Sequence, residues 1–186
     1  MALNEEVLEE IAVFVRAGFD DRDRIIEIFL EELYEPGEWV PDEIAQAVDK
    51  AQAEHEAEKA SWPDTTDCDR LNAAFENLEA YGVIALHNAG NTQSDGYSDF
   101  CEALHQHTDP SSIQGYCFYH WQDLERAVTG HGLCLAFGPA NPKEEESRGA
   151  AVGSVVMQAL EEAGLNVEWD GSFNQRILVP MDWKRR

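Results

Sequence analysis

The segment GYCFYHWQDLERAVTGHGLCLAFG, residues 115–138, decides the fold because it places an amphipathic run between two apolar ones. The apolar runs, 116–119 and 133–137, are typical of buried strands, and about residues 122–129 have the spacing of a short helix. The connection between the two strands has roughly eleven residues, which is the lower limit for a parallel crossover. The sequence therefore leaves the direction of this strand pair open.

The same alternation of strand and helix continues before this segment. A run of apolar residues at helical spacing ends at Gly82, and the apolar run 83–86 follows as an expected strand. A polar loop, 88–96, then leads to an expected helix at about 97–106.

After this segment, the longest expected helix covers about residues 143–163. Its Gly149 and Gly153 would let it approach a sheet closely, although each costs up to about 1 kcal/mol in helix propensity. The chain then forms an expected hairpin around Asp170-Gly171, with alternating apolar residues in 167–169 and 177–179. We therefore predict an α/β fold, or alternatively α+β: a β-α-β-α-β-α-β-β domain over residues 65–186 with one sheet of about five strands covered by helices.

The first part of the chain, residues 1–64, is predicted to be an acidic helical segment. A first helix follows a possible cap at Asn4, a second begins near Asp20 or Asp21, and a third opens at Pro41. Residues 1–66 contain 19 acidic and 5 basic side chains, so negative charge is densest here.

Composition excludes several classes of protein. A hydrophobic content of 44% indicates a globular chain. No apolar run approaches the roughly 20 residues that cross a bilayer, and the acidic start is unlike a secretory signal, so we expect a cytoplasmic protein. A net charge of −24 disfavours nucleic acid and anionic membranes and favours a basic protein as partner.

The sequence also gives no reason to expect a cofactor or a metal. It contains neither a phosphate-binding loop nor a dinucleotide fingerprint. His105 and His107 are the closest histidine pair, but residues two apart on a helix do not face each other. We therefore predict no cofactor and no metal site.

Residues 68–183 carry several specific motifs. The combination of FYHxQDxERA, residues 118–127, with GLxVxWDG, residues 164–171, resembles a family of uncharacterised bacterial domains, a domain of unknown function. The resemblance implies no activity, cofactor or partner. Some relatives have cysteines in the loop after the first strand, where this chain has Asn88-Ala89-Gly90-Asn91.

The sharpest catalytic candidates are His120 and Asp123. His120 ends an expected strand, and Asp123 follows in the first turn of a helix, so the carboxylate could orient a general-base histidine. The alternative is structural, because an aspartate near a helix N-terminus also satisfies free backbone amides. The sequence does not separate these two roles.

A second group of polar residues follows the first expected strand, which ends at His87. If the first two strands are parallel, their ends share one edge of the sheet, where ligands of open α/β sheets bind. The alternative is again structural, since Thr92 and Asp95 also fit an approximate capping box. The candidate ligand-binding residues are His87, Asn88, Asn91, Thr92, Ser94 and Asp95.

Three functional hypotheses are compatible with these features. The leading one is a non-enzymatic binding or regulatory protein, immunity-like or inhibitor-like, whose acidic surface engages a basic partner. The second is a small hydrolase or transferase that uses His120 and Asp123. The third is a structural module in which the motif residues hold helices to the sheet.

Overall fold

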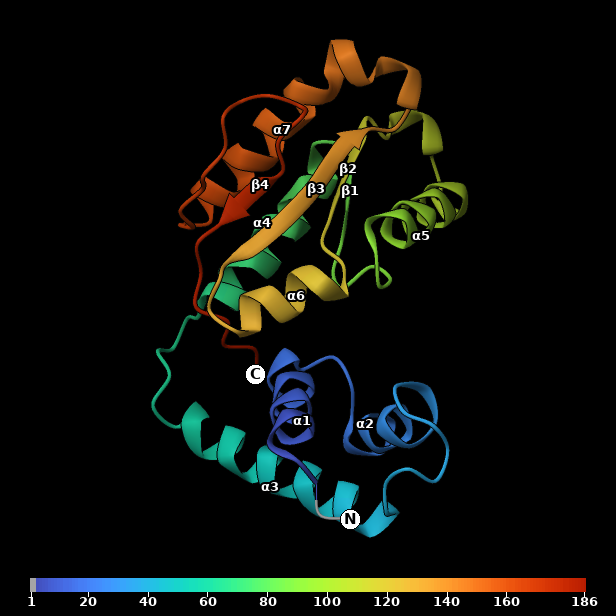
Figure 1. Cartoon of the computed structure of the whole chain (residues 1–186). Helices are drawn as coiled ribbons and strands as arrows, with labels where there is room; N and C mark the ends of the chain where they lie inside the picture. The colour runs from blue at the N-terminus through green and yellow to red at the C-terminus, as the bar shows by residue number, and fades with distance from the viewer. Residues whose placement is uncertain (1–2) are drawn as a thin grey trace. The chain divides into compact units, whose positions relative to one another are not determined.

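The computed structural model describes residues 3–186, which divide into two compact units (Figure 1). The first unit contains the described residues up to Thr66 together with Trp183–Arg186, and the second contains Asp67–Asp182. The last four residues thus pack with the helical unit, whereas the sequence analysis grouped them with the sheet. Within residues 3–186, no helix has the length and apolar character needed to cross a bilayer.

The first unit consists of helices packed around an apolar core. Its elements are α1 (Glu5–Ala17), α2 (Arg22–Glu27), the π-helix η1 (Ile28–Glu32) and α3 (Pro41–Lys59). The expected cap of α1 is present, since the Asn4 side chain accepts from the backbone N–H of Val7 at 2.9 Å. Of the two expected starts of the second helix, Asp21 is the residue that caps α2. The Trp183 indole N–H donates to the Arg16 carbonyl at 3.2 Å, which ties the end of the chain to this unit.

The second unit follows the expected order of strands and helices. Its elements are α4 (Asp67–Ala80), β1 (Val83–Leu86), α5 (Gln93–Gln106), β2 (Gly115–Phe118), α6 (Trp121–Val128), β3 (Leu133–Pro139), α7 (Glu145–Glu162) and β4 (Ile177–Val179), with short 3-10 turns η2 (Pro110–Ser112) and η3 (Pro142–Glu144).

The four strands form one mixed sheet in the order β1-β2-β3-β4. Strands β1 and β2 are parallel, and helix α5 lies in the crossover between them. Strands β2 and β3 are antiparallel, as are β3 and β4. The direction that the sequence left open is therefore antiparallel, and the predicted class is confirmed as a mixed sheet covered by helices, of the α+β kind.

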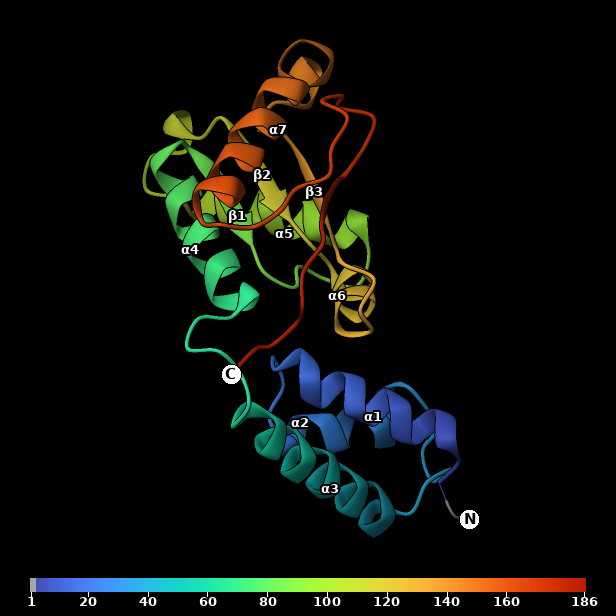
Figure 2. The same ribbon diagram turned by 90° about the vertical axis from the view of Figure 1, so that its left-hand side faces the viewer.

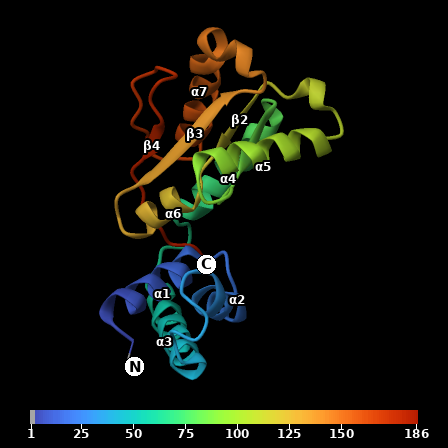
Figure 3. The same cartoon turned by 45° about the vertical axis from the view of Figure 1, so that its right-hand side comes forward.

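Helices cover both faces of this sheet. Helices α4 and α7 pack together on one face, in front of the strands in Figure 2, and α5 lies over the other, in front of the strands in Figure 3. Gly153 of α7 allows the close approach expected from the sequence, because a Cβ there would lie 2.7 Å from the Phe137 ring of β3. Gly149 instead lies against Phe173, outside the sheet.

The structure corrects two of the expected elements. Helix α5 begins at Gln93, inside the stretch expected as the loop 88–96, because the capping box of Thr92 and Asp95 starts it.

The predicted hairpin is incomplete. Its first arm is reduced to a single β-bridge, between Glu168 and Leu178, so the sheet has four strands among the described residues rather than about five. The Trp169 indole N–H donates to the carbonyls of Ser172 and Gln175 at 3.0 and 3.1 Å. These bonds draw the intervening residues into a compact loop, which prevents the two arms from pairing further.

Candidate functional site

The loops that follow β1 and β2 are bonded to each other. The backbone N–H of Ala89 donates to the Tyr119 carbonyl at 2.8 Å, and the N–H of Trp121 donates to the Gly90 carbonyl at 3.0 Å. Because β1 and β2 are parallel, both loops leave the same end of the sheet. The predicted site residues after the two strands therefore lie at one edge, as the sequence analysis expected.

The loop after β1 ends in a capping box at the start of α5. The backbone N–H groups of Thr92 and Asn91 donate to the Asp95 carboxylate at 2.9 and 3.2 Å, and the Asp95 N–H donates to the Thr92 hydroxyl oxygen at 3.3 Å. The Thr92 hydroxyl lowers the pKa of Asp95, and the nearby His120 imidazole contributes to this lowering. Thr92 and Asp95 thus cap α5, and the Asp95 carboxylate lies close enough to His120 to interact with its charge.

The rest of this loop has a constrained backbone. Gly90 has a φ of +60°, and a Cβ there would lie 2.3 Å from the Cβ of Asp95, so the capping box requires glycine at this position. Asn88 also has a positive φ, +46°, and its buried side-chain oxygen has no hydrogen-bond partner among the described residues. Ser94 is exposed in the first turn of α5.

His120 and Asp123 form a buried pair at the start of α6. The His120 Nε2 lies 3.1 Å from the Asp123 Oδ2, and each residue is only 4% exposed. The same carboxylate oxygen accepts from the His120 backbone N–H at 3.3 Å and from the guanidinium of Arg176. Arg176 also donates to the Cys134 carbonyl of β3 at 3.0 Å. The cluster therefore joins the start of α6 to β3 and to the segment before β4.

The electrostatics of this cluster favour a neutral imidazole. Burial lowers the pKa of His120, the Arg176 guanidinium lowers it further, and the carboxylates of Asp123 and Asp95 oppose both effects. The negative charge of Asp123 is balanced by Arg176, so the histidine is not needed as its counter-ion. His120 Nδ1 has no hydrogen-bond partner within residues 3–186.

Replacing His120 with glutamine will make the stability of the protein less sensitive to acid. Because the pKa of His120 is lower in the folded chain than in the unfolded one, the unfolded chain binds the proton more strongly. Stability is therefore complete above the ordinary pKa of about 6.5 and is lost as the pH falls below it, by up to about 1.4 kcal/mol per pH unit. Urea unfolding at about pH 7.5 and about pH 5.5 measures this loss.

The control for this prediction is His131→Gln, since His131 is exposed. That variant should retain the pH dependence of the parent, including the part due to His55, whose pKa burial also lowers. An equal loss of stability on acidification in His120→Gln and the parent would contradict the assignment.

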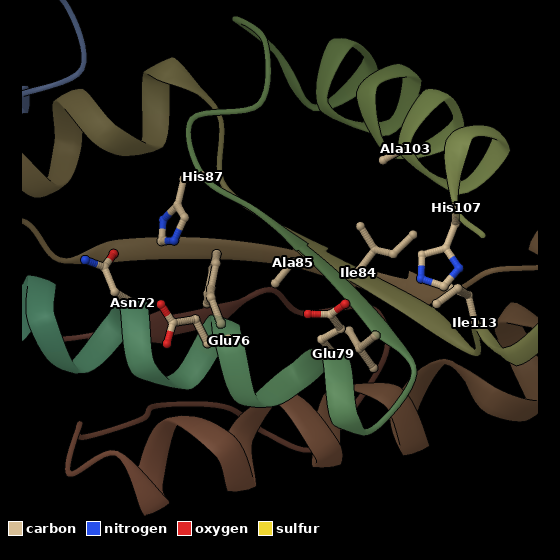
Figure 4. Close-up of a pocket in the computed structure, with 11 residues that line it drawn as sticks. Asn72, Glu76, Glu79, Ile84, Ala85, His87, Ala103, His107 and Ile113 are labelled. Carbon is tan, nitrogen blue, oxygen red and sulfur yellow. The ribbon is translucent and has the colours of Figure 1, made fainter. Parts of the chain in front are cut away.

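His87 does not join the cluster of His120 and Asp123; its ring lies against aromatic side chains beside β1. Its Nδ1 lies 2.9 Å from the Tyr119 hydroxyl, and its ring stacks on Phe75 of α4 with the ring centroids 4.5 Å apart. It lines a groove of about 420 Å³ beside β1, between α4 and α5 (Figure 4). The residues that line this groove, hereafter the β1 groove, are Asn72, Phe75, Glu76, Glu79, Val83, Ile84, Ala85, His87, Ala103, His107 and Ile113.

The structure thus brings together only part of the predicted set. Asp95, His120 and Asp123 are neighbours, with Asn91 and Thr92 in the same capping loop, whereas His87 is the one predicted residue that lines the β1 groove. Sequence reasoning missed Arg176, which lies 53 positions after Asp123. The sequence does contain one signal, because an arginine directly before an apolar strand needs an acidic partner if it is partly buried.

Glu76 and Glu79 were also missed. Both are exposed residues of α4, and Figure 4 shows them on the side of the helix that faces β1. Their spacing of three places them on one face of a helix, but acidic residues on a helix surface are ordinary, so the pattern did not mark a site. They line the same groove only because α4 lies beside β1, the strand at the edge of the sheet.

Comparison with known proteins adds a family but no activity. Neither the curated proteins nor the solved structures gave a match to this chain. The family described as "Domain of unknown function (DUF6891)" matches residues 2–186, which extends over both units and beyond the stretch whose motifs carried the resemblance. The chain therefore belongs to the DUF6891 family, whose domain takes in the acidic helical unit as well as the sheet.

Proposed function

We propose that this chain is a non-enzymatic binding protein of the cytoplasm that engages a basic protein. The observation that carries the proposal is the β1 groove, which has an apolar floor and two carboxylates, Glu76 and Glu79, at its wall. None of the described residues that line it is lysine or arginine. A concave apolar surface with a few placed charges is typical of a recognition site, and here the charges select a cation.

The net charge of −24 supports the same reading. A long-range negative field raises the rate at which a basic partner arrives, while the groove supplies short-range selectivity. Both features suit a protein that neutralises a basic toxin or fills the basic cleft of a nucleic-acid enzyme. We therefore place the chain among immunity-like or inhibitor-like regulatory proteins, with no nucleic acid or membrane as its ligand.

The geometry at His120 and Asp123 supports a structural role more than a catalytic one. The carboxylate is already bonded to Arg176 and to the backbone at the start of α6, and both residues are 4% exposed. One feature favours the alternative, a small hydrolase or transferase: the unpartnered Nδ1 of His120 could accept a proton. A substrate would first have to reach a nearly inaccessible ring, so the binding function is the stronger proposal.

The proposal is tested by capture from the cells that produce the protein. The full chain is immobilised, exposed to lysate at about 0.05 M salt, and eluted in steps to about 0.5 M, with the released proteins identified by mass spectrometry. We expect a basic protein that leaves the column as the salt rises, because screening weakens an association between opposite charges. An unrelated protein of similar negative charge serves as the control for simple ion exchange.

Two results would contradict the proposal. One is that the chain retains nothing beyond what the control retains. The other is a specific partner that is acidic, or one whose retention is the same at both salt concentrations, because either would point to an interface without charge complementarity.

A further inference from the structure

Strand β1 is an open edge of the sheet. In the described part of the chain it pairs only with β2, and three of its four residues are partly exposed, whereas every residue of β2 is buried. An edge strand presents backbone N–H and C=O groups that can pair with another chain. No helix of the described residues closes this edge, because the β1 groove follows it between α4 and α5.

The pairing with β2 indicates which backbone groups face outward. Val83 pairs with Gly115, and the Gly115 N–H donates to the Gly82 carbonyl at 3.3 Å. In a parallel pair with this register, the groups that face β2 are the Gly82 carbonyl and the backbone of Ile84, the residues on either side of Val83. Backbone groups alternate between the two edges of a strand, so those of Val83 and Ala85 face away from β2. The N–H and C=O of Ala85 therefore lie at the centre of the open edge, beside the groove.

The two walls of the β1 groove differ in chemistry. On the α4 side, His87 stacks on Phe75, and Glu76 and Glu79 provide carboxylates. On the α5 side, Ile84 and Leu86 belong to an apolar cluster built around Phe100, and the wall itself includes Ala103. His107, at the end of α5, and Ile113 complete that side. One wall therefore suits cationic side chains, and the other, apart from His107, suits small apolar ones.

An added strand would use both walls at once. Its side chains would alternate between the two faces of the sheet, so every second residue would meet the carboxylates of α4 and the others would meet α5. Lysine or arginine at the first set and small apolar residues at the second would complement the groove. A second copy of this chain is a poor occupant, because it would bring the same glutamates and the same net charge of −24 to the edge.

We propose that the open edge of β1 receives an extended segment of the partner, in which basic and small apolar residues alternate, as an additional strand of the sheet. This inference rests on the proposed function and specifies its mode of binding. Backbone pairing along Ala85 supplies affinity that does not depend on side chains, and Glu76 and Glu79 select the basic residues.

The test uses the full chain and a short synthetic peptide in which lysine and valine alternate. In Ala85→Pro the outward N–H is lost, while the sheet keeps its own bonds, because proline is tolerated on an edge strand where the N–H faces away from the sheet. Ala85→Val is the matched control, since it adds similar bulk and keeps the N–H. By calorimetry we expect Ala85→Val to bind the peptide as the parent does, and Ala85→Pro to bind it about tenfold more weakly.

The peptide provides a second test that does not depend on any variant folding. Methylating alternate backbone nitrogens along one edge of the peptide should abolish binding, and methylating those along the other edge should leave it intact. A peptide of the same composition with its lysines grouped together should bind more weakly than the alternating one, because it cannot place its charges on one face.

Each contrary result has a distinct meaning. If the peptide binds with the same affinity to Ala85→Pro and Ala85→Val, or in both methylated forms, strand addition is wrong while a basic partner can still be held by charge. Failure of the parent chain to bind the alternating peptide also overturns strand addition, and the capture experiment then decides the proposed function separately. Self-association that is lost in Ala85→Pro would identify a second copy as the occupant and overturn the basic segment.

Discussion

Replacing Asp123 with alanine will lower the free energy of unfolding by about 2–3 kcal/mol, the largest loss that we expect from a single change at the motif. The carboxylate is nearly inaccessible and is bonded to Arg176, to the His120 ring and to the His120 backbone. Removing one member of a buried pair typically costs about 3–5 kcal/mol, and we expect a smaller loss here because the Arg176 side chain is 33% exposed and can regain water. Denaturant unfolding at neutral pH measures the change.

Asp99→Ala is the matched control, because Asp99 is an exposed aspartate in a helix of the same unit. Its free energy of unfolding should change by less than about 0.5 kcal/mol. If Asp123→Ala were as stable as this control, the cluster would not hold α6 to the sheet. The pair His120 and Asp123 would then need another explanation, and catalysis would be the first to consider.

Reversing two charges in the β1 groove will have the largest effect on binding. In Glu76→Lys/Glu79→Lys we expect the captured basic partner to bind about 30-fold more weakly. Each reversal replaces an attraction by a repulsion and costs about 1 kcal/mol of binding free energy, so the two together cost about 2 kcal/mol. Glutamate and lysine have similar helix propensities, so α4 should be unaffected. Calorimetric titration with the captured partner measures the affinity, and circular dichroism checks the fold.

Glu161→Lys/Glu162→Lys provides the control for net charge. These residues are exposed in the last turn of α7, outside the groove, and the double change alters the net charge by the same amount. The control should weaken binding only slightly, through the long-range field. An equal loss in both double variants would mean that the whole acidic surface holds the partner and that the β1 groove has no special part.

Much of the second unit was predictable from local patterns. The expected strand at 83–86 coincides with β1, and the α5 cap at Thr92 and Asp95 follows from the spacing of a capping box. Such features depend on residues that are close in sequence. Their energies are set by backbone amides and neighbouring side chains, which a single sequence displays directly.

The remaining features depend on contacts between distant residues. Arg176 reaches Asp123 only because β4 pairs with β3 and brings the two segments together. The failure of the hairpin has the same origin, since Trp169 packs against Phe137 and Gly153 instead of extending a strand. Periodicity shows that residues 167–169 are partly apolar, but it does not show which surface they cover.

The candidate site also combines features set by residues close in sequence with features set by contacts between distant ones. The two histidines that follow β1 and β2 were expected in one pocket, and the chain does place both at one edge of the sheet. Their rings nevertheless have different neighbours, with His87 against Phe75 and His120 against Asp123. The β1 groove arises because α4 and α5 lie on opposite faces of the sheet beside its edge strand β1, and no motif in the sequence indicates that arrangement.

Hydrogen exchange of the full chain, with and without the captured partner, shows whether a basic partner is held along β1. We expect the amide of Ala85 to exchange more slowly once the partner is bound, because its outward N–H becomes bonded, while the amides of α6 exchange at an unchanged rate. If the partner is bound and Ala85 exchanges as fast as in the free protein, the partner is not held along β1.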